Sequence, residues 1–245
     1  MRLKMRHLAF FVTFSFMLNN ACAYEKRITA EGLKTFAVKT GKTRVIFNPS
    51  ENGQSVEVTN PQDYPMLVQS MVLKEDKKNP ASFIITPPLF RLEGGQSSRI
   101  SVIPTSADFP KNRESLNWIC LTGVPPDEED SSQKNKSKIL IQLRMTTCIK
   151  LITRPESVTG TSIEHANELS WVKNGSVLTI NNPTPFYMNL FKIQNGSYII
   201  KNPGYVPPMG ALKFKIPSEL NDHFEFSLVT DYGGESKIFN AAEKN

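Results

Sequence analysis

The segment that most constrains the fold is residues 138–155, KILIQLRMTTCIKLITRP. Ile139, Ile141, Leu143 and Met145 alternate with a more polar set of residues, so a β-strand would carry all four side chains on one face. A strand this long and apolar is an aggregation hazard if it lies at a sheet edge. It therefore either runs through the centre of a sandwich or offers its apolar row to another chain, and alternation alone favours the central strand.

Residues 1–23 have the features of a secretion signal. They combine a basic start, an apolar core at residues 8–18 that is too short to span a bilayer, and a small-residue cleavage site at residues 21–23. We expect the mature chain to begin at Tyr24 and to be exported. Lipidation of Cys22 is the alternative, which the preceding asparagines disfavour.

The net charge gives little indication of a nucleic-acid partner. It is +6 for the whole chain and falls to +3 once the three basic residues of the signal, Arg2, Lys4 and Arg6, are removed. A balance this small does not by itself indicate binding to nucleic acid. We expect no nucleic-acid partner.

Two cysteines, Cys120 and Cys148, remain in the mature chain. An even count in an exported chain favours one disulfide, with two isolated thiols as the alternative. A bridge closing a loop of this length would stabilise the fold by about 3 kcal/mol in the loop-entropy model. It would also join the two ends of residues 125–138, a polar, charged stretch whose composition predicts a mobile loop.

Short β-rich runs recur along the chain, separated by turns of Gly, Pro and Asn, which is typical of antiparallel sandwiches. We expect strands in residues 35–39, 43–47, 56–61, 64–73, 83–85, 90–92, 99–103, 116–121, 169–171, 176–180, 186–191, 211–216 and 224–230. In the second half, the expected turns are residues 182–183, 195–196, 202–203 and 233–234. Pro155 ends the long strand and divides the chain into residues 24–154 and residues 155–245. The sequence thus predicts an all-β chain of two sandwiches.

No catalytic constellation is recognisable. The two histidines after the signal, His165 and His223, lie in no metal or nucleophile pattern, and the motifs of zinc proteases, P-loop proteins and serine hydrolases do not occur. We therefore expect no enzyme activity, cofactor, metal or small-molecule substrate.

Six segments, in order, resemble the periplasmic pilus chaperones of the chaperone–usher pathway. They are residues 43–47 (TRVIF), 86–92 (TPPLFRL), 113–118 (RESLNW), 148–155 (CIKLITRP), 182–189 (NPTPFYMN) and 231–234 (DYGG). The cysteine pair resembles the long-loop subfamily typified by the F1-capsule chaperone, although the loop of this chain is shorter than that type implies.

The resemblance implies two immunoglobulin-like domains set at an angle, with a cleft between them. Arg44 and Lys150 would lie in this cleft and bind the C-terminal carboxylate of a fibre subunit. Residues Ile139, Ile141, Leu143 and Met145 would be a strand donated to that subunit. Phe36 and Val38 are candidates for additional subunit contact.

Further implications concern the junction and the partners. Glu114, Arg154 and Asp231 match an ion-pair network between the domains. The partners would be a fimbrial, capsular or adhesin subunit and an outer-membrane usher, and the location would be the periplasm. The sequence leaves open whether the free chaperone self-associates. The alternative function is that of a secreted fibre subunit or adhesin, against which two domains and an internal donor strand both speak.

Overall fold

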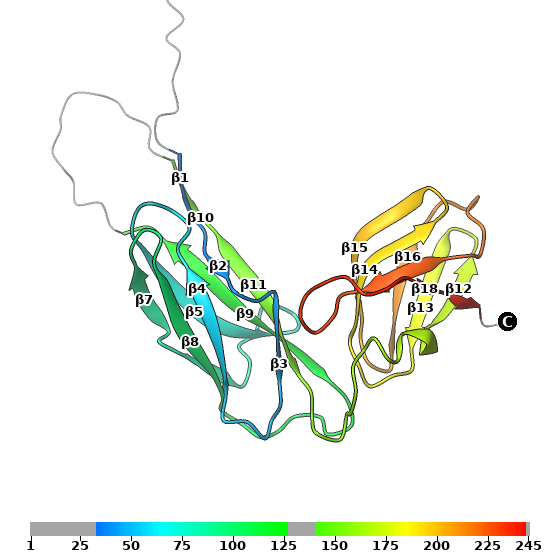
Figure 1. Cartoon of the computed structure of the whole chain (residues 1–245), viewed down its shortest axis with the longest axis horizontal. Helices are drawn as coiled ribbons and strands as arrows, with labels where there is room; N and C mark the ends of the chain where they lie inside the picture. The colour runs from blue at the N-terminus through cyan, green and yellow to red at the C-terminus, as the bar shows by residue number, and fades with distance from the viewer. Residues whose placement is uncertain (1–32, 127–140, 244–245) are drawn as a thin grey trace, which may run out of the picture.

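The computed structural model describes residues 33–126 and 141–243 of the 245-residue chain. The predicted signal peptide, most of the predicted loop and Ile139 lie outside these ranges. The described residues form two β-sandwiches that meet in a V (Figure 1). No helix among them is long and apolar enough to cross a bilayer.

The first sandwich packs two larger sheets against each other and adds a short strand pair. The first sheet has the order β3 (Arg44–Phe47), β11 (Thr146–Thr153), β9 (Ser115–Val124), β5 (Met66–Lys74) and β7 (Leu89–Leu92). The second has the order β2 (Lys39–Thr40), β4 (Gln54–Thr59), β8 (Ser97–Pro104) and β6 (Phe83–Thr86). The pair consists of β1 (Leu33–Phe36) and β10 (Ile141–Arg144), which run parallel.

The second sandwich packs two four-stranded sheets. One has the order β16 (Gly210–Lys215), β13 (Val177–Asn182), β12 (Ser170–Asn174) and β19 (Ala242–Glu243). The other has the order β15 (Tyr198–Val206), β14 (Met188–Asn195), β17 (Glu225–Leu228) and β18 (Phe239–Asn240). A single turn of 3₁₀ helix, η1 (Ala166–Glu168), precedes β12.

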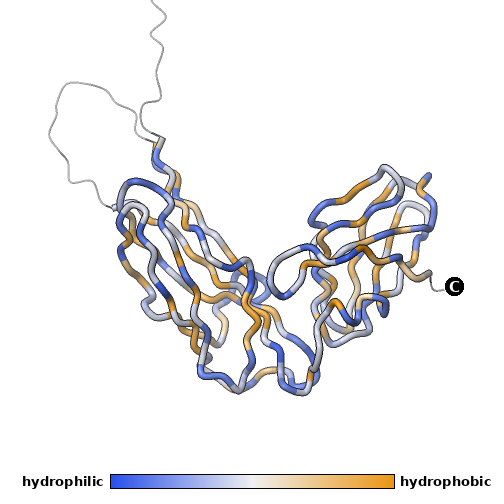
Figure 2. Tube along the Cα trace, viewed as in Figure 1, coloured by the Kyte–Doolittle hydropathy of each residue, from blue (hydrophilic) through white to orange (hydrophobic). Residues whose placement is uncertain are grey.

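Period-two burial explains why these segments form strands. In β4, for example, Val56 and Val58 are fully buried while the residues between and beside them are not. Apolar and polar residues alternate in this way along many strands (Figure 2), and the inward side chains form one core in each sandwich. The predicted all-β fold of two immunoglobulin-like sandwiches is confirmed.

Three local predictions were wrong. Residues 35–39 are not one strand, because β1 ends at Phe36 and β2 begins at Lys39. Residues 138–155 are not one strand: β10 ends at Arg144, β11 begins at Thr146, and the two pair with different neighbours. The predicted turn at residues 202–203 lies inside β15, because a bulge opposite β14 accommodates it. There Asn202 has a φ of 50° and Gly204 a φ of 114°, so the Asn-Pro-Gly sequence kinks the strand without ending it.

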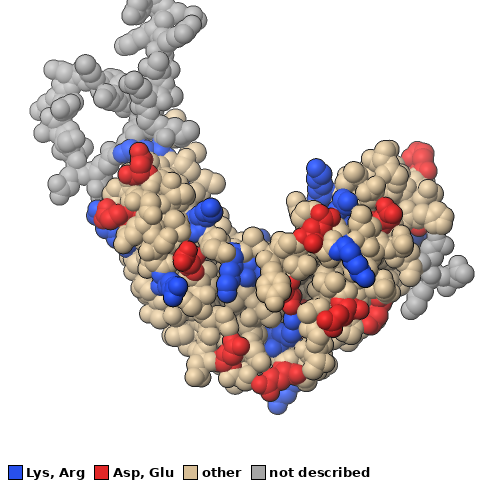
Figure 3. All heavy atoms as spheres, viewed as in Figure 1, with Lys and Arg blue, Asp and Glu red and all other residues tan. Residues whose placement is uncertain are grey.

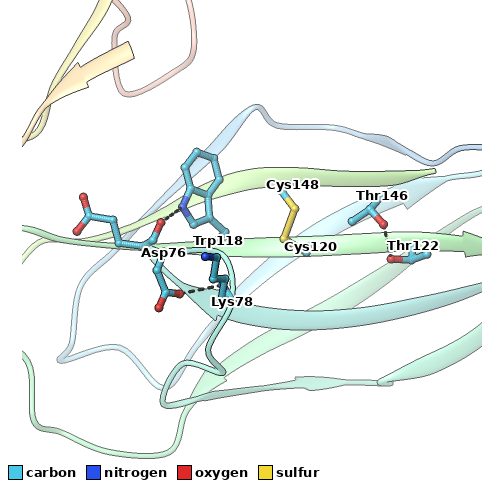
Figure 4. The surroundings of a disulfide bond; sticks show 8 residues. Asp76, Lys78, Trp118, Cys120, Thr122, Thr146 and Cys148 are labelled. Atoms are coloured by element: carbon cyan, nitrogen blue, oxygen red, sulfur yellow. Dashed lines mark hydrogen bonds between the residues drawn. A yellow bond between two sulfur atoms is a disulfide. The ribbon is translucent and has the colours of Figure 1, made fainter.

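The predicted disulfide is confirmed. Cys120 in β9 and Cys148 in β11 are direct partners in the antiparallel register, with Cα atoms 4.1 Å apart, and their sulfurs are bonded. Figure 4 shows the bridge between the two strands, with Trp118 farther along β9. Two positions beyond Cys120, the Thr122 and Thr146 hydroxyls lie 2.8 Å apart. The bridge therefore ties β11, and with it the connection to β10, to the centre of its sheet.

Candidate functional site

An apolar row lies exposed on and just after β10. Ile141, Leu143 and Met145 expose 48%, 45% and 46% of their surface, whereas side chains of this kind are usually buried. Among the described strands β10 has only one partner, β1, with Leu143 opposite Thr35. The Met145 N–H donates to the Phe36 carbonyl, so the row is fixed to the sandwich at its C-terminal end. The described part of the predicted donor row is thus available to another chain.

The same run of sequence becomes buried once it enters β11. Ile149 and Leu151, which continue the odd-numbered set, belong to the core of the first sandwich. Ile152 belongs to a separate apolar cluster that includes Trp118 and Tyr187 and spans the junction of the two sandwiches. One continuous stretch therefore leads from an exposed apolar row into the rigid junction.

Phe36 and Val38, predicted as additional subunit contacts, are core residues. Phe36 is 1% exposed and packs edge-on against Tyr64, and Val38 is 5% exposed. Both side chains fill the first sandwich, so they present no surface to a partner in this conformation. Their backbone has a different role, because the Phe36 carbonyl accepts the Met145 N–H.

The structure brings Arg44 and Lys150 together. They are direct partners in the parallel pairing of β3 with β11, at the junction of the sandwiches. Arg44 is 8% exposed; its Nη1 donates to the carbonyl of Val229 at 3.4 Å, and its buried Nε has no partner among the described residues. The Nζ of Lys150 donates to the side-chain oxygen of Asn189.

The ammonium group of Lys150 is partly buried and lies close to two aromatic rings. Its Nζ lies 4.8 Å from the centre of the Tyr205 ring and 5.8 Å from that of Trp118. Burial lowers the pKa of Lys150 to about 8, and the charges of Arg44 and Lys77 act in the same direction. Burial also lowers the pKa of Arg44, against the opposing effect of Asp231 and Glu114. Two partly desolvated cations in one place favour the arrival of an anion.

A second charged group lies at the same junction. Arg154 Nε donates to Glu114 at 2.7 Å, and its two terminal nitrogens donate to Asp231 at 2.8 and 3.0 Å. The other oxygen of Glu114 accepts the backbone N–H of Tyr187. These contacts link residues of the first sandwich, the connection after β11 and the second sandwich. The three residues of the predicted network are therefore in contact across the two domains.

Sequence reasoning missed a further link between the sandwiches. Glu75, at the end of β5, accepts hydrogen bonds from the hydroxyls of Tyr187 and Tyr205, at 3.1 and 3.0 Å. Burial, with Glu75 nearby, raises the pKa of Tyr205 to about 12 and also raises that of Tyr187. Glu75 lies in a charged run that is typical of an ordinary turn. No sequence pattern predicts its contact with tyrosines more than a hundred positions away.

The space-filling view shows the V as a hollow between the sandwiches, with both basic and acidic side chains on the faces that border it (Figure 3). Residues 37–159 match the N-terminal domain of the family described as pili and flagellar-assembly chaperone, PapD. Residues 164–239 match the C-terminal domain of the pili assembly chaperone PapD. This chain belongs to the PapD family of chaperones.

Individual members of the PapD family are similar over most of their length. The chaperone protein PsaB of Yersinia pestis is 42% identical in an alignment that covers 91% of this chain and 90% of PsaB. The crystal structure of the Escherichia coli chaperone DraB has a TM-score of 0.78 at 42% identity, covering 87% of this chain and 99% of DraB. The Salmonella enterica chaperone SafB, solved in complex with the SafA pilin, has a TM-score of 0.77 at 42% identity, covering 84% of this chain and 96% of SafB.

Proposed function

We propose that this PapD-family chain is a periplasmic chaperone that captures a fimbrial, capsular or adhesin subunit, completes its fold with a donated strand, and delivers it to an outer-membrane usher. The observation that carries the proposal is an exposed apolar row that leads along one stretch of chain to two adjacent cations. The similarity to SafB, whose structure was solved with a pilin, supports the class of partner. The alternative of a fibre subunit or adhesin is not favoured, because both halves match chaperone domains.

The row supplies the free energy of capture. Burying Ile141, Leu143 and Met145 in a groove of the subunit would contribute about 4.5–9 kcal/mol, at about 1.5–3 kcal/mol for each side chain. Ile139 would be the fourth member of the row. The cost of ordering both chains reduces the net gain. Backbone hydrogen bonds along the open edge of β10 would add the pairing typical of β-augmentation.

The two cations set the register of this pairing. A subunit carboxylate held by Arg44 and Lys150 would receive charge-assisted hydrogen bonds, each worth about 1.5–3 kcal/mol. Met145 lies five residues before Lys150, which is about 16 Å along an extended strand. With the carboxylate fixed, each side chain of the row meets one position in the subunit, and a slip of one residue would turn the row away.

Delivery then needs no nucleotide. A subunit completed by a borrowed strand can exchange that strand for one from the next subunit if the replacement packs better. The disulfide, which persists in an oxidising compartment, suits action in the periplasm.

The test is recovery of the subunit from periplasm with a tagged chain. Leu143→Asp places a charge in the row and should abolish co-purification of the exported protein that the wild-type chain recovers. Val172→Asp is the matched control: Val172 is 41% exposed on β12 of the second sandwich, so this variant should recover the subunit normally. Normal recovery by Leu143→Asp would exclude the donated row.

A further inference from the structure

A neutral acceptor from the second sandwich lies on the anchor lysine. Asn189, in β14, is 3% exposed. Its side-chain oxygen accepts from Lys150 Nζ, and its Nδ2 donates to the carbonyl of Tyr187 at 3.1 Å. An amide oxygen cannot donate to that carbonyl, so the contact with Tyr187 fixes the orientation that turns the oxygen towards Lys150.

The position of Asn189 is coupled to that of Arg44. The backbone N–H of Val229 donates to the Asn189 carbonyl at 2.7 Å, and the Val229 carbonyl accepts from Arg44 Nη1 at 3.4 Å. Lys150 and Arg44 are themselves register partners on neighbouring strands. Two cations side by side on one sandwich therefore face two neutral acceptors side by side on the other.

This arrangement leaves donors for a ligand. A lysine ammonium has three N–H donors, and the contact with Asn189 uses one of them. The Arg44 guanidinium has five N–H donors, and its hydrogen bond to the Val229 carbonyl uses one of them. The acceptors of the second sandwich therefore orient the two cations without neutralising either of them.

We propose that Asn189 is a positioning residue of the carboxylate anchor, which holds one N–H of Lys150 so that the other two point to the subunit's C-terminus. This inference rests on the proposed function, because it presumes that Arg44 and Lys150 bind that carboxylate. A neutral amide is the side chain suited to the task. An aspartate of the same shape would form an internal ion pair with Lys150 and repel the incoming carboxylate, and an alanine would leave the ammonium unoriented.

The experiment compares two peptides that differ only at the carboxylate. The probe is a synthetic peptide of the C-terminal strand of the co-purifying subunit, made as the free acid and as the C-terminal amide, and titrated into the full-length chaperone. The measured quantity is the ratio of the two affinities, which a purely structural effect of a substitution would leave unchanged. For the wild-type chain we expect the acid to bind at least about tenfold more tightly than the amide.

Asn189→Asp should bring this ratio close to one, and Asn189→Ala should lower it about threefold or more. Asn174→Asp adds the same charge at the exposed last residue of β12 and should keep the wild-type ratio. If Asn189→Asp fails to fold, the acid-to-amide affinity ratio of Asn189→Ala tests the inference instead. Wild-type ratios in the folded Asn189 variants would overturn the inference and leave the proposed function intact. A wild-type chain that does not distinguish acid from amide would instead refute the anchor itself, and this inference with it.

Discussion

Two cationic groups lie at the junction of the sandwiches, and they differ in their partners. Arg154 contacts the carboxylates of Glu114 and Asp231. Among the described residues, Arg44 and Lys150 contact no carboxylate, and the acceptors facing them are an amide and a backbone carbonyl. A buried cation that is paired with carboxylates of the same chain stabilises the fold. A pair of cations that contacts no such carboxylate can bind an anion from another molecule.

This contrast separates stability from binding. The Arg154 group joins the two domains and is nearly closed to solvent, with 14% of the Arg154 side chain and 1% of the Glu114 side chain exposed. Removing one member leaves the others with unsatisfied charge or hydrogen bonds in a place that water reaches poorly. Removing Arg44 or Lys150 breaks no ion pair among the described residues, so the loss should appear only when a subunit is present.

The largest effect is expected from Glu114→Ala. The change removes a buried partner of Arg154 and the acceptor of the Tyr187 N–H, which should lower the free energy of unfolding by about 3–5 kcal/mol. Urea denaturation measures this. Glu93→Ala is the control, because Glu93 pairs with Arg91 at the same 2.7 Å but with more than half of each side chain exposed, so solvent screens the pair and its loss should lower the free energy of unfolding far less. If both variants lost the same free energy of unfolding, the Arg154 group would not have the structural role assigned to it.

Lys150→Ala and Arg44→Ala should reduce subunit binding more than they reduce stability, which is the opposite of Glu114→Ala. Each should lower the free energy of unfolding by less than Glu114→Ala does and weaken subunit binding by about 1.5–3 kcal/mol, which is roughly ten- to hundredfold. Affinity titration and urea denaturation of the same preparations give both numbers. Lys213→Ala, an exposed lysine on β16, is the control for simple loss of positive charge. A substantial loss of stability with unchanged binding would reverse the contrast between the two groups.

The smallest effect is a pH dependence of binding. With a pKa of about 8 in the free chain, Lys150 is charged below that pH, and a bound carboxylate raises its pKa further. The affinity should therefore be constant below about pH 8 and fall above it by up to about tenfold per pH unit, until the pKa of the complex is reached. Lys150→Arg keeps its charge throughout and should remove this dependence. If the affinity of Lys150→Arg depended on pH as that of the wild type does, the group that titrates would not be Lys150.

The sequence predicted what alternation and composition determine. Period two identified most strands, an even number of cysteines in a chain expected to be exported indicated the bridge, and the spacing of Ile141, Leu143 and Met145 put them on one face. It could not show which faces are buried. Phe36 and Val38 alternate as the apolar row does, and only the packing of the first sandwich distinguishes a core strand from an exposed one.

Contacts between distant segments were the other limit. Arg44 and Lys150 are neighbours because β3 pairs in parallel with a strand that follows it by about a hundred residues, and no local pattern encodes such a pairing. The resemblance to pilus chaperones brought these two residues together, but it assigned no role to Asn189 or Glu75. Asn189 and Glu75 both form contacts between the domains, and patterns within single strands do not predict such contacts.

The most direct measurement is the structure of this chain in complex with the subunit that it recovers from the periplasm. The account predicts residues 141–145 lying in the subunit's groove, with Ile141, Leu143 and Met145 buried, and the subunit's terminal carboxylate within hydrogen-bonding distance of both Arg44 and Lys150. A groove occupied by another segment, or a terminus that ends away from these two cations, would contradict it.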